Sequence, residues 1–237
     1  MFLAPSTWHL DATEKSSPQP KTHGFFSFRG RVELLAPPTF PEDFARARRT
    51  NLVRTGRPRF LHHIIGKPAH GDRNGTMLLM HAMQRSRGNY ELIVKSQEPI
   101  QRLLPDNRIT WDHSAPEEQQ ALYEGFDAMV MPRRYDGLSL PCNESLMSAL
   151  PVIMSHTSPN NVVLPPEWLV PGQFRGGFVA GTPIQYVEAD INALARKLDE
   201  LTTMPEEQLR GWRSEALARS AQFDPATLKP KYQAAFA

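Results

Sequence analysis

The sequence predicts an α/β fold built on a Rossmann-like, doubly wound parallel sheet. From residue 59 onward, short apolar runs alternate with stretches of helical spacing, and strands that alternate with helices pair in parallel. The chain has 237 residues, of which 40% are hydrophobic, so it can bury a sizeable core. Its one cysteine, Cys142, cannot form a disulfide within the chain, so no disulfide framework contributes to this fold.

Five short apolar runs predict the strands of the sheet. Each is rich in aliphatic or aromatic residues and is bounded by polar residues, glycine or proline. The runs cover residues 59–67, 90–96, 108–111, 126–132 and 151–155. His62 and His63 lie on opposite faces of the first strand, so at most one of them faces a ligand site. A proline-rich loop over residues 158–172 follows the last strand.

Helices are expected between these strands. The apolar-rich residues 76–86 predict the first helix, for which Asp72 or Asn74 is a candidate N-cap. Residues 114–117 have the Ser-x-x-Glu spacing of a capping box, which predicts a helix that runs to about Tyr123.

Four further helices are predicted in the second half of the chain. They cover residues 142–150, 187–201, 205–221 and 225–236. In the second of these, five apolar residues recur at helical spacing and form one face. These residues are Val187, Ile191, Leu194, Leu198 and Leu201.

Residues 1–57 do not have the pattern of a complete domain. Residues 11–24 are polar and typical of a loop or linker, and residues 31–44 hold one short strand-like run ended by prolines. Residues 1–60 carry ten Lys and Arg against five Asp and Glu. This bias indicates either a solvated, partly flexible arm or an attraction to phosphate-rich partners. The predicted ligand-binding domain is residues 58–237.

Three classes of protein lack support in the sequence. No stretch reaches the roughly 18 consecutive apolar residues of a membrane span. The N-terminus lacks the basic flank and apolar region of a signal peptide, so a cytoplasmic location is expected. There are no Cys and His pairs at zinc spacing, so no structural metal is expected.

Residues 135–154, YDGLSLPCNESLMSALPVIM, place two carboxylates across a loop between a strand and a helix. Ligands of an open parallel sheet bind outside the carboxyl ends of its strands. There Gly137 lets backbone N–H groups approach a ligand, and the helix directs its positive end at the same point, which suits a phosphate or pyrophosphate. Glu144 could bind a ribose diol and Asp136 a sugar. A structural interpretation is also open, with Glu144 as a partner of the helix dipole and Asp136 as a turn residue.

Residues 131–155 resemble the Glu-x7-Glu segment of the retaining GT-B glycosyltransferases of the family 4 type, whose pattern is approximately PSxxEGFGLPxLEAMAxGxPVI. Asp136 stands at the first acidic position and Glu144 at the second, and Pro151-Val152-Ile153 closes the motif. The resemblance implies that Glu144 binds the nucleotide ribose and that Asp136 contacts the donor sugar. It also implies that the loop behind Asp136 contacts the sugar and the diphosphate. That loop holds Gly137, Leu138 and Ser139.

Residues 60–83 resemble the family's strand, Gly-Arg, loop, Lys-Gly and helix, in which two basic residues neutralise the donor pyrophosphate. Gly66-Lys67 stands for Gly-Arg and Asn74-Gly75 for Lys-Gly, so the lysine is missing here. Arg73 or Lys95 could supply the charge instead. The resemblance thus implies catalytic roles for Asp136, Lys67 and Arg73, and donor binding by Gly66, Gly75 and Lys95. Asp136 is also shorter than the family's glutamate by about 1.5 Å, so that either the loop moves inward or the sugar contact differs.

The resemblance extends over residues 28–237, and residues 1–11 resemble the last strand of the family's N-terminal domain. GT-B enzymes hold the acceptor between two Rossmann-like domains. Residues 1–57 are therefore expected to be a remnant of, or a linker from, an N-terminal acceptor domain. Residues 58–237 are expected to be the donor domain, the C-terminal half of a GT-B fold. A second subunit or domain would then supply the acceptor site.

The predicted function is a retaining glycosyltransferase that takes its sugar from a nucleotide-diphosphate sugar and needs no metal or other cofactor. Two alternatives are open. The missing lysine and the missing domain favour a non-catalytic nucleotide-sugar-binding subunit or fragment. The basic residues 29–59 point instead to sugar transfer directed at nucleic acid.

Overall fold

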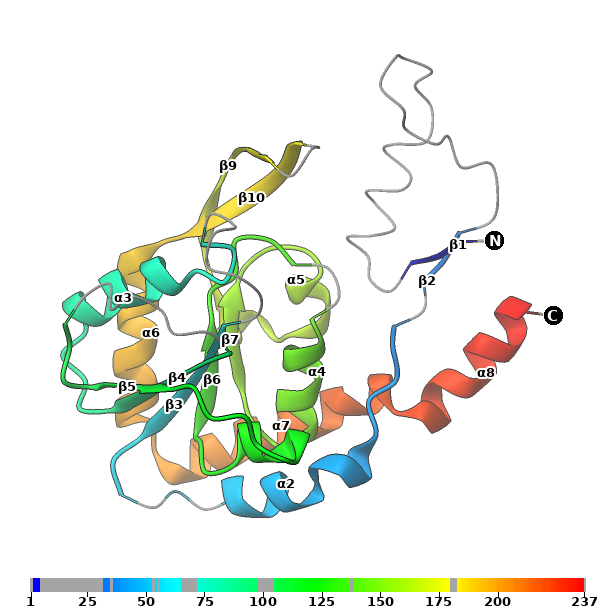
Figure 1. The fold of residues 1–237 in the computed structure, drawn as a ribbon, viewed down its shortest axis with the longest axis horizontal. Helices are drawn as coiled ribbons and strands as arrows, with labels where there is room; N and C mark the ends of the chain where they lie inside the picture. Colours follow the sequence, from blue (N-terminus) through cyan, green and yellow to red (C-terminus); the bar gives the residue numbers. More distant parts are fainter. Residues whose placement is uncertain are drawn as a thin grey trace.

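The computed structural model describes residues 2–4, 32–34, 36–52, 54, 56–64, 72–97, 105–136, 139–179 and 183–236. Its centre is a parallel sheet in the order β5-β4-β3-β6-β7-β8 (Figure 1). The strands are β3 (Arg59–Ile64), β4 (Glu91–Ser96), β5 (Ile109–Asp112), β6 (Ala128–Met131), β7 (Val152–Ser155) and β8 (Leu169–Val170). Counted within this sheet alone, the order is 3-2-1-4-5-6, that of a doubly wound Rossmann fold. The predicted fold class is confirmed.

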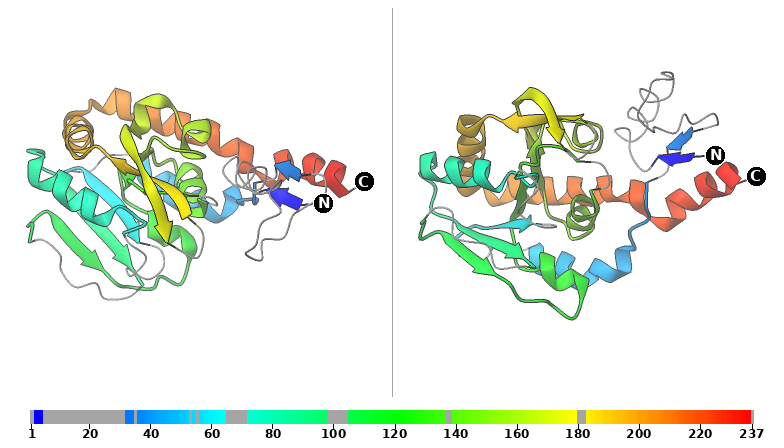
Figure 2. Two further views of the ribbon diagram at one scale, coloured as in Figure 1. Left: turned by 90° about the horizontal axis from the view of Figure 1, so that it is seen from above. Right: turned by 45° about the horizontal axis from the view of Figure 1, so that its top comes forward.

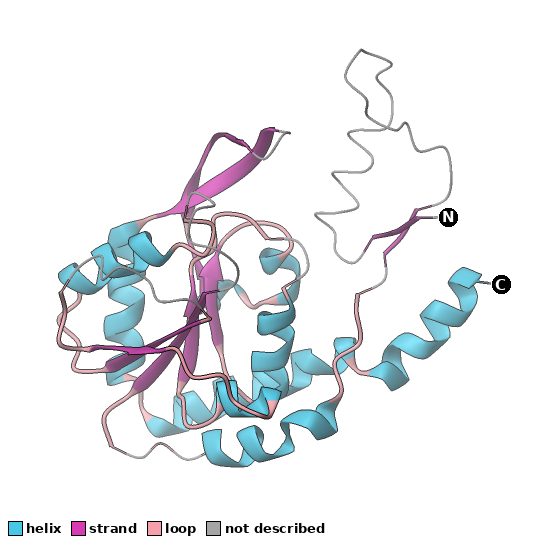
Figure 3. Cartoon of the chain, in the orientation of Figure 1, coloured by secondary structure: helices cyan, strands magenta, loops and turns pink. Residues whose placement is uncertain are grey.

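Helices cover both faces of the sheet, as Figures 1 and 3 show. On one face, α3 (Thr76–Arg85) packs against α6 (Ile191–Thr203). On the other, α4 (Leu140–Met147) packs against α7 (Glu206–Ser220), and the chain ends in α8 (Pro225–Phe236). No helix among the described residues is both long and apolar enough to cross a membrane.

The sheet confirms the five predicted strands and adds elements that the sequence did not indicate. β8 lies inside the predicted proline-rich loop and has only two residues, too few to show a pattern. It is followed by an antiparallel hairpin of β9 (Gly172–Val179) and β10 (Pro183–Ala189), which projects from the sheet in Figure 1. Val187 belongs to β10, so its assignment to a helix was wrong. The helix begins at Ile191 because Asp190 caps it, accepting a 2.7 Å hydrogen bond from the Ala193 N–H.

Two other helix predictions need correction. The predicted capping box does not form, because the Ser114 N–H donates to Asp112 Oδ1 at 2.8 Å instead. The chain then makes a short 3-10 helix, η2 (Gln119–Tyr123), where an α-helix was expected. The helix predicted over residues 142–150 is α4, which begins and ends earlier.

The segment before the sheet packs on the Rossmann body. It contains η1 (Pro41–Phe44) and α2 (Ala45–Asn51), neither of which was predicted. The buried amide of Asn51 donates to the Tyr123 and Ser148 carbonyls at 2.8 and 2.9 Å and accepts from the Gly125 and Phe126 N–H groups. All four bonds that the amide can make are thus used to fix α2.

The extreme N-terminal strands lie near the other end of the chain. β1 (Phe2–Ala4) pairs in parallel with β2 (Val32–Leu34), which confirms the strand-like run that the sequence showed there. Figures 1 and 2 show this pair near α8. The Tyr232 hydroxyl of α8 donates to the Ala36 carbonyl at 2.9 Å, so α8 also contacts the segment that leads into the body.

A buried cluster of charges lies at the amino ends of the central strands. Arg213 of α7 is 1% exposed and donates to Asp127 Oδ1 at 2.9 Å and to Glu206 Oε1 at 3.0 Å. Asp127 also accepts from the Arg59 N–H at 2.9 Å and from Arg54 Nε at 3.2 Å. Burial lowers the pKa of Arg213. The cluster joins α7 to the starts of β3 and β6.

Candidate functional site

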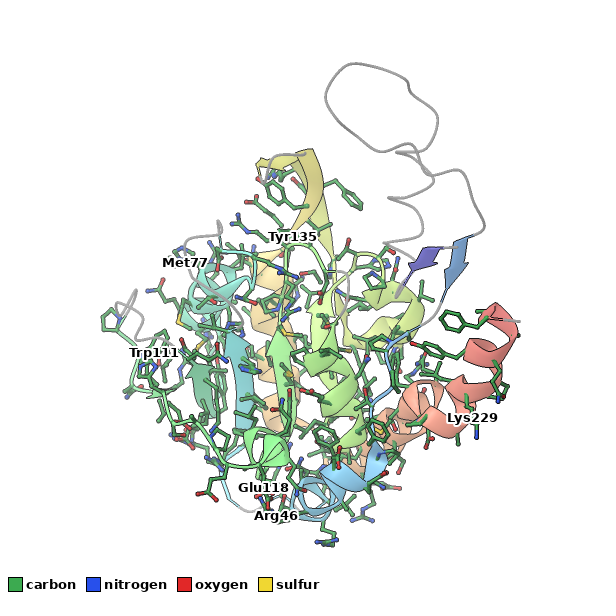
Figure 4. All side chains as sticks on the ribbon, turned by 45° about the vertical axis from the view of Figure 1, so that its right-hand side comes forward. Arg46, Met77, Trp111, Glu118, Tyr135 and Lys229 are labelled. Carbon is green, nitrogen blue, oxygen red and sulfur yellow. The ribbon has the colours of Figure 1, made fainter. Side chains whose placement is uncertain are left out.

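The candidate site lies at the carboxyl edge of the sheet, where β3 and β6 are neighbours. The chain leaves β3 toward β4 on one side and β6 toward β7 on the other, which makes this the topological switch point. Figure 4 shows Tyr135, from the loop after β6, at this edge, and Glu118 toward the opposite end. Four predicted site residues lie outside the described residues. These are Gly66, Lys67, Gly137 and Leu138.

The loops that follow β3 and β6 are in backbone contact. The Arg134 N–H donates to the Arg73 carbonyl at 3.0 Å. Gly75 has φ +70°, and a Cβ built on it would lie 2.0 Å from the Pro132 carbonyl oxygen. Only glycine fits this close approach. The predicted donor-binding glycine is therefore where the two loops meet.

Residues at the start of α3 close the first of these loops. The N-cap position is Gly75, rather than the predicted Asp72 or Asn74. Asp72 nevertheless supports the helix, because its Oδ2 accepts a 3.1 Å hydrogen bond from the Met77 N–H. Burial raises the pKa of Asp72.

Asp136 is buried against an arginine that sequence reasoning missed. Arg133, itself 2% exposed, places Nη1 at 2.9 Å from both carboxylate oxygens of Asp136. Arg73 Nη2 lies 3.9 Å from the same carboxylate, and its guanidinium stacks over the Tyr135 ring at 5.1 Å. The available signal was an arginine three residues before the acid, where the family pattern has serine. The predicted role of Asp136 as the residue that orients the sugar stays a prediction.

His62 joins β3, β6 and α3 beneath this edge. It is fully buried, with Nδ1 2.8 Å from the Val130 carbonyl and Nε2 3.0 Å from the Thr76 hydroxyl. Because a carbonyl only accepts, Nδ1 carries the proton and Nε2 accepts from Thr76. Burial, with smaller contributions from the nearby His63 and Arg133, lowers the pKa of His62 to about 4.

This environment predicts that the protein loses stability in mild acid. His62 is neutral in the folded state down to pH about 4, whereas the unfolded chain takes up the proton near pH 6.5. The contribution of His62 to the free energy of unfolding is therefore complete above pH 6.5 and falls as the pH drops toward 4. Between pH 8 and pH 5, the wild type should lose roughly 2 kcal/mol more unfolding free energy than His62→Gln. Urea titrations at both pH values measure this difference, and equal losses would contradict it.

Glu144 lies in a pocket of about 400 Å³ between α4, η2 and the segment before α2. Its Oε2 accepts from the Tyr123 hydroxyl and from Gln119 Nε2, the latter at 3.1 Å. Burial and the Glu144 carboxylate raise the pKa of Tyr123 well above its usual value, so the phenol keeps its proton. The lining residues are Pro38, Thr39, Phe40, Asp43, Phe44, Glu118, Gln119, Gln120, Leu140 and Glu144.

The chemistry of this pocket favours an uncharged polar ligand with an aromatic portion. Its lining includes three carboxylates and no Lys or Arg, so it would repel a phosphate. The aromatic Phe40, 47% exposed, could contact a flat ring. Leu140, the first residue of α4, connects the pocket to the helix N-terminus.

Lys95 and Cys142 are engaged within the protein. Lys95 Nζ donates to Asp112 Oδ2 at 2.6 Å, and this bond lowers the pKa of Asp112 to about 2. Burial raises the pKa of Cys142 to about 12, so its thiol stays protonated and packs as a small buried residue. Within the described part of the chain, no group of three or more His, Cys, Asp or Glu side chains is placed to hold a metal ion.

Comparison with known proteins identifies the fold. No protein-family model matches the chain, and no curated protein is significantly similar in sequence. Sucrose-phosphate synthase from Thermosynechococcus elongatus matches 99% of this chain and 57% of its own, with a TM-score of 0.70 and 18% identity. HepE from Anabaena, solved with UDP and glucose, matches 99% of this chain and 62% of its own, with a TM-score of 0.67 and 13% identity.

A third match is the pneumococcal O-GlcNAc transferase GtfA, solved with UDP and GlcNAc. It covers 99% of this chain and 44% of its own, with a TM-score of 0.65 and 12% identity. The chain therefore spans about half the length of these structures. The likeness confirms that the fold is that of the C-terminal half of a GT-B glycosyltransferase.

Proposed function

We propose that this chain, which has the C-terminal fold of the GT-B glycosyltransferases, binds a nucleotide-diphosphate sugar and transfers its sugar with retention of configuration. The observation that carries the proposal is the placement of Glu144 in a pocket beside α4, the helix that follows the switch-point strand β6. The solved structures with UDP and a sugar, HepE and GtfA, support the same class of ligand.

The pocket would hold the nucleoside. Two hydroxyls of a ribose can donate to one carboxylate, and no described residue donates to Oε1 of Glu144. The diphosphate would then extend past Leu140 to the N-terminus of α4, whose dipole favours an anion. Lys67 and Arg73 are proposed to face the diphosphate. The glycines of the two loops, Gly66, Gly75 and Gly137, would let their backbones approach it, beside Leu138 and Ser139.

The proposed reaction needs positioning and charge more than a dedicated base. The bond from the anomeric carbon to the diphosphate breaks, the acceptor oxygen bonds to that carbon on the same face, and the departing phosphate oxygen takes the acceptor's proton. Cations and helix N–H groups stabilise the charge that develops on the diphosphate. No metal or other cofactor takes part in this proposal. We propose that a second domain or subunit supplies the acceptor site, and a cytoplasmic location stays a prediction.

Nucleic acid is not part of the proposal. Four basic residues between positions 29 and 59 are held by protein groups: Arg46, Arg48, Arg54 and Arg59. Arg46 pairs with Glu118 at 2.8 Å and Arg59 with Glu91 at 3.0 Å. Arg48 donates to the Pro41 carbonyl and Arg54 to Asp127. Each of these side chains therefore has a partner within the protein, and the structure adds no observation that favours nucleic acid.

Titration calorimetry with nucleotide sugars tests the proposal, and Glu144→Ala is its key variant. The wild type should bind UDP-glucose or UDP-GlcNAc, and Glu144→Ala should weaken binding roughly 10- to 100-fold, because it removes charge-assisted hydrogen bonds to the ribose. Glu215→Ala, which removes an exposed carboxylate on α7, should bind as the wild type does.

The outcomes separate the proposal from its alternatives. Absence of wild-type binding to every nucleotide sugar would overturn it. Binding that is equally strong in Glu144→Ala would place the nucleoside elsewhere. Binding without release of free UDP, even with candidate acceptors and partner domains present, would indicate the non-catalytic subunit instead.

A further inference from the structure

Four buried polar atoms at the switch point have no hydrogen-bond partner among the described residues. They are the Nε atoms of Arg73 and Arg133, Oγ of Ser139 and Nδ1 of His63. All four can act as hydrogen-bond donors. Buried polar atoms in proteins are nearly always paired, so a group of unpaired donors in one place calls for a ligand that accepts.

The four atoms come from three loops or strand ends that meet. The guanidinium groups of Arg73 and Arg133 both reach the carboxylate of Asp136, at 3.9 and 2.9 Å. Ser139 is three residues further on, at the N-cap position of α4, where its side chain makes no capping bond. His63 lies one residue from the end of β3, and burial, then the charges of Arg133 and Lys95, lower its pKa to about 4.

The charge of this group favours an anion. Two guanidinium groups face one carboxylate, and the N-terminus of α4 adds partial positive charge. The neighbouring Lys95 is already paired with Asp112. A phosphate group has the oxygens to accept from several of these donors at once.

We propose that Arg133 is a donor-contacting residue whose Nε–H binds a phosphate oxygen of the nucleotide diphosphate, and that Asp136 is the positioning residue that holds its guanidinium. This inference rests on the proposed function. Arg133 directs one nitrogen, Nη1, at both oxygens of Asp136 and keeps Nε unpaired. A planar guanidinium can bind two partners on different edges in this way, which an ammonium group cannot do with the same geometry.

The proposal explains why the acid is aspartate. A glutamate would reach about 1.5 Å further and would occupy the space that the Arg133 guanidinium fills. In the family pattern, a lysine in the loop before α3 supplies positive charge to the diphosphate, and this chain has Asn74 at that position. In this proposal Arg133, held by Asp136, supplies that charge. The positive charge reaches the diphosphate from the β6 loop instead.

The test compares UDP with uridine, because only UDP carries the phosphates. In Arg133→Met, the affinity for UDP should fall roughly 10- to 100-fold, while the affinity for uridine stays unchanged. Arg175→Met, on the exposed hairpin, is the control and should leave both affinities unchanged. Asp136→Asn should also lower the ratio of the affinity for UDP to the affinity for uridine, and Asp136→Glu should not restore this ratio.

Two results would overturn the proposal: an unchanged affinity of Arg133→Met for UDP, or an equal loss for UDP and uridine. A wild type that binds neither ligand would instead contradict the proposed function. If Arg133→Met fails to fold because the buried Asp136 carboxylate loses its closest ion-pair partner, Arg133→Met/Asp136→Leu removes both charges. The UDP-to-uridine ratio of this double variant then decides the question by the same criterion.

Discussion

Replacing Arg213 with methionine is expected to lower the free energy of unfolding by about 3–5 kcal/mol. The guanidinium is 1% exposed and is the partner of both Asp127 and Glu206. Its removal leaves the mostly buried Asp127 carboxylate with Arg54, at 3.2 Å, as its charged partner among the described residues. In the wild type, the ion pair with Arg213 offsets the free-energy cost of burying the Asp127 carboxylate. In the variant this compensation is lost, so the folded state is destabilised relative to the unfolded state.

Urea unfolding of Arg213→Met and of Arg175→Met measures this effect. Arg175 is half exposed and forms an ion pair with Glu188 on the hairpin, so its loss should cost less than about 1 kcal/mol. Equal stability of the two variants would show that the buried cluster contributes no more than a surface ion pair.

Gly75→Ala is expected to cost about 2–4 kcal/mol and to weaken nucleotide binding at the same time. The added Cβ would lie 2.0 Å from the Pro132 carbonyl oxygen, so one of the two loops must move. The positive φ of +70° adds about 1 kcal/mol for any residue with a Cβ. Both loops belong to the proposed diphosphate site, so a shift of either changes the contacts offered to the ligand.

Gly56→Ala isolates the steric part of this effect. Gly56 has a similar φ of +82°, but a Cβ there meets nothing within 4 Å. It should cost only about 1 kcal/mol and leave UDP affinity unchanged. If Gly75→Ala is no worse than Gly56→Ala in unfolding and calorimetry, the contact between the loops has no energetic importance.

The sequence predicted most of the fold because its central strands are apolar runs that alternate with stretches of helical spacing. The elements that it missed have a physical reason. β8 has two residues and lies between prolines, so it shows no period, and it is a strand only because β7 offers it an edge. The capping-box spacing at residues 114–117 failed because Asp112 competes for the same N–H group. Both differences from the prediction depend on contacts that form in the folded chain, which local sequence patterns do not show.

The sequence also located the two acids but could not assign their surroundings. Glu144 lies in a pocket, as a ligand-binding residue should, yet the Tyr123 hydroxyl that holds it comes from a distant segment. Asp136 is buried against Arg133. The sequence shows that an arginine stands at this position, but not that its side chain is buried against the acid. Arg133 could have been suspected from its spacing, but the unpaired Nε atom could not.

The four hydrogen bonds of Asn51 have a consequence for how the protein opens. Because one side chain ties α2 to the turns that enter β6 and β7, α2 cannot detach without leaving backbone groups of both turns without these hydrogen bonds. Backbone amides in α2 should therefore exchange with solvent deuterium only through the same cooperative opening as those of β6. A short helix at the edge of the molecule would then be among its slowest-exchanging segments.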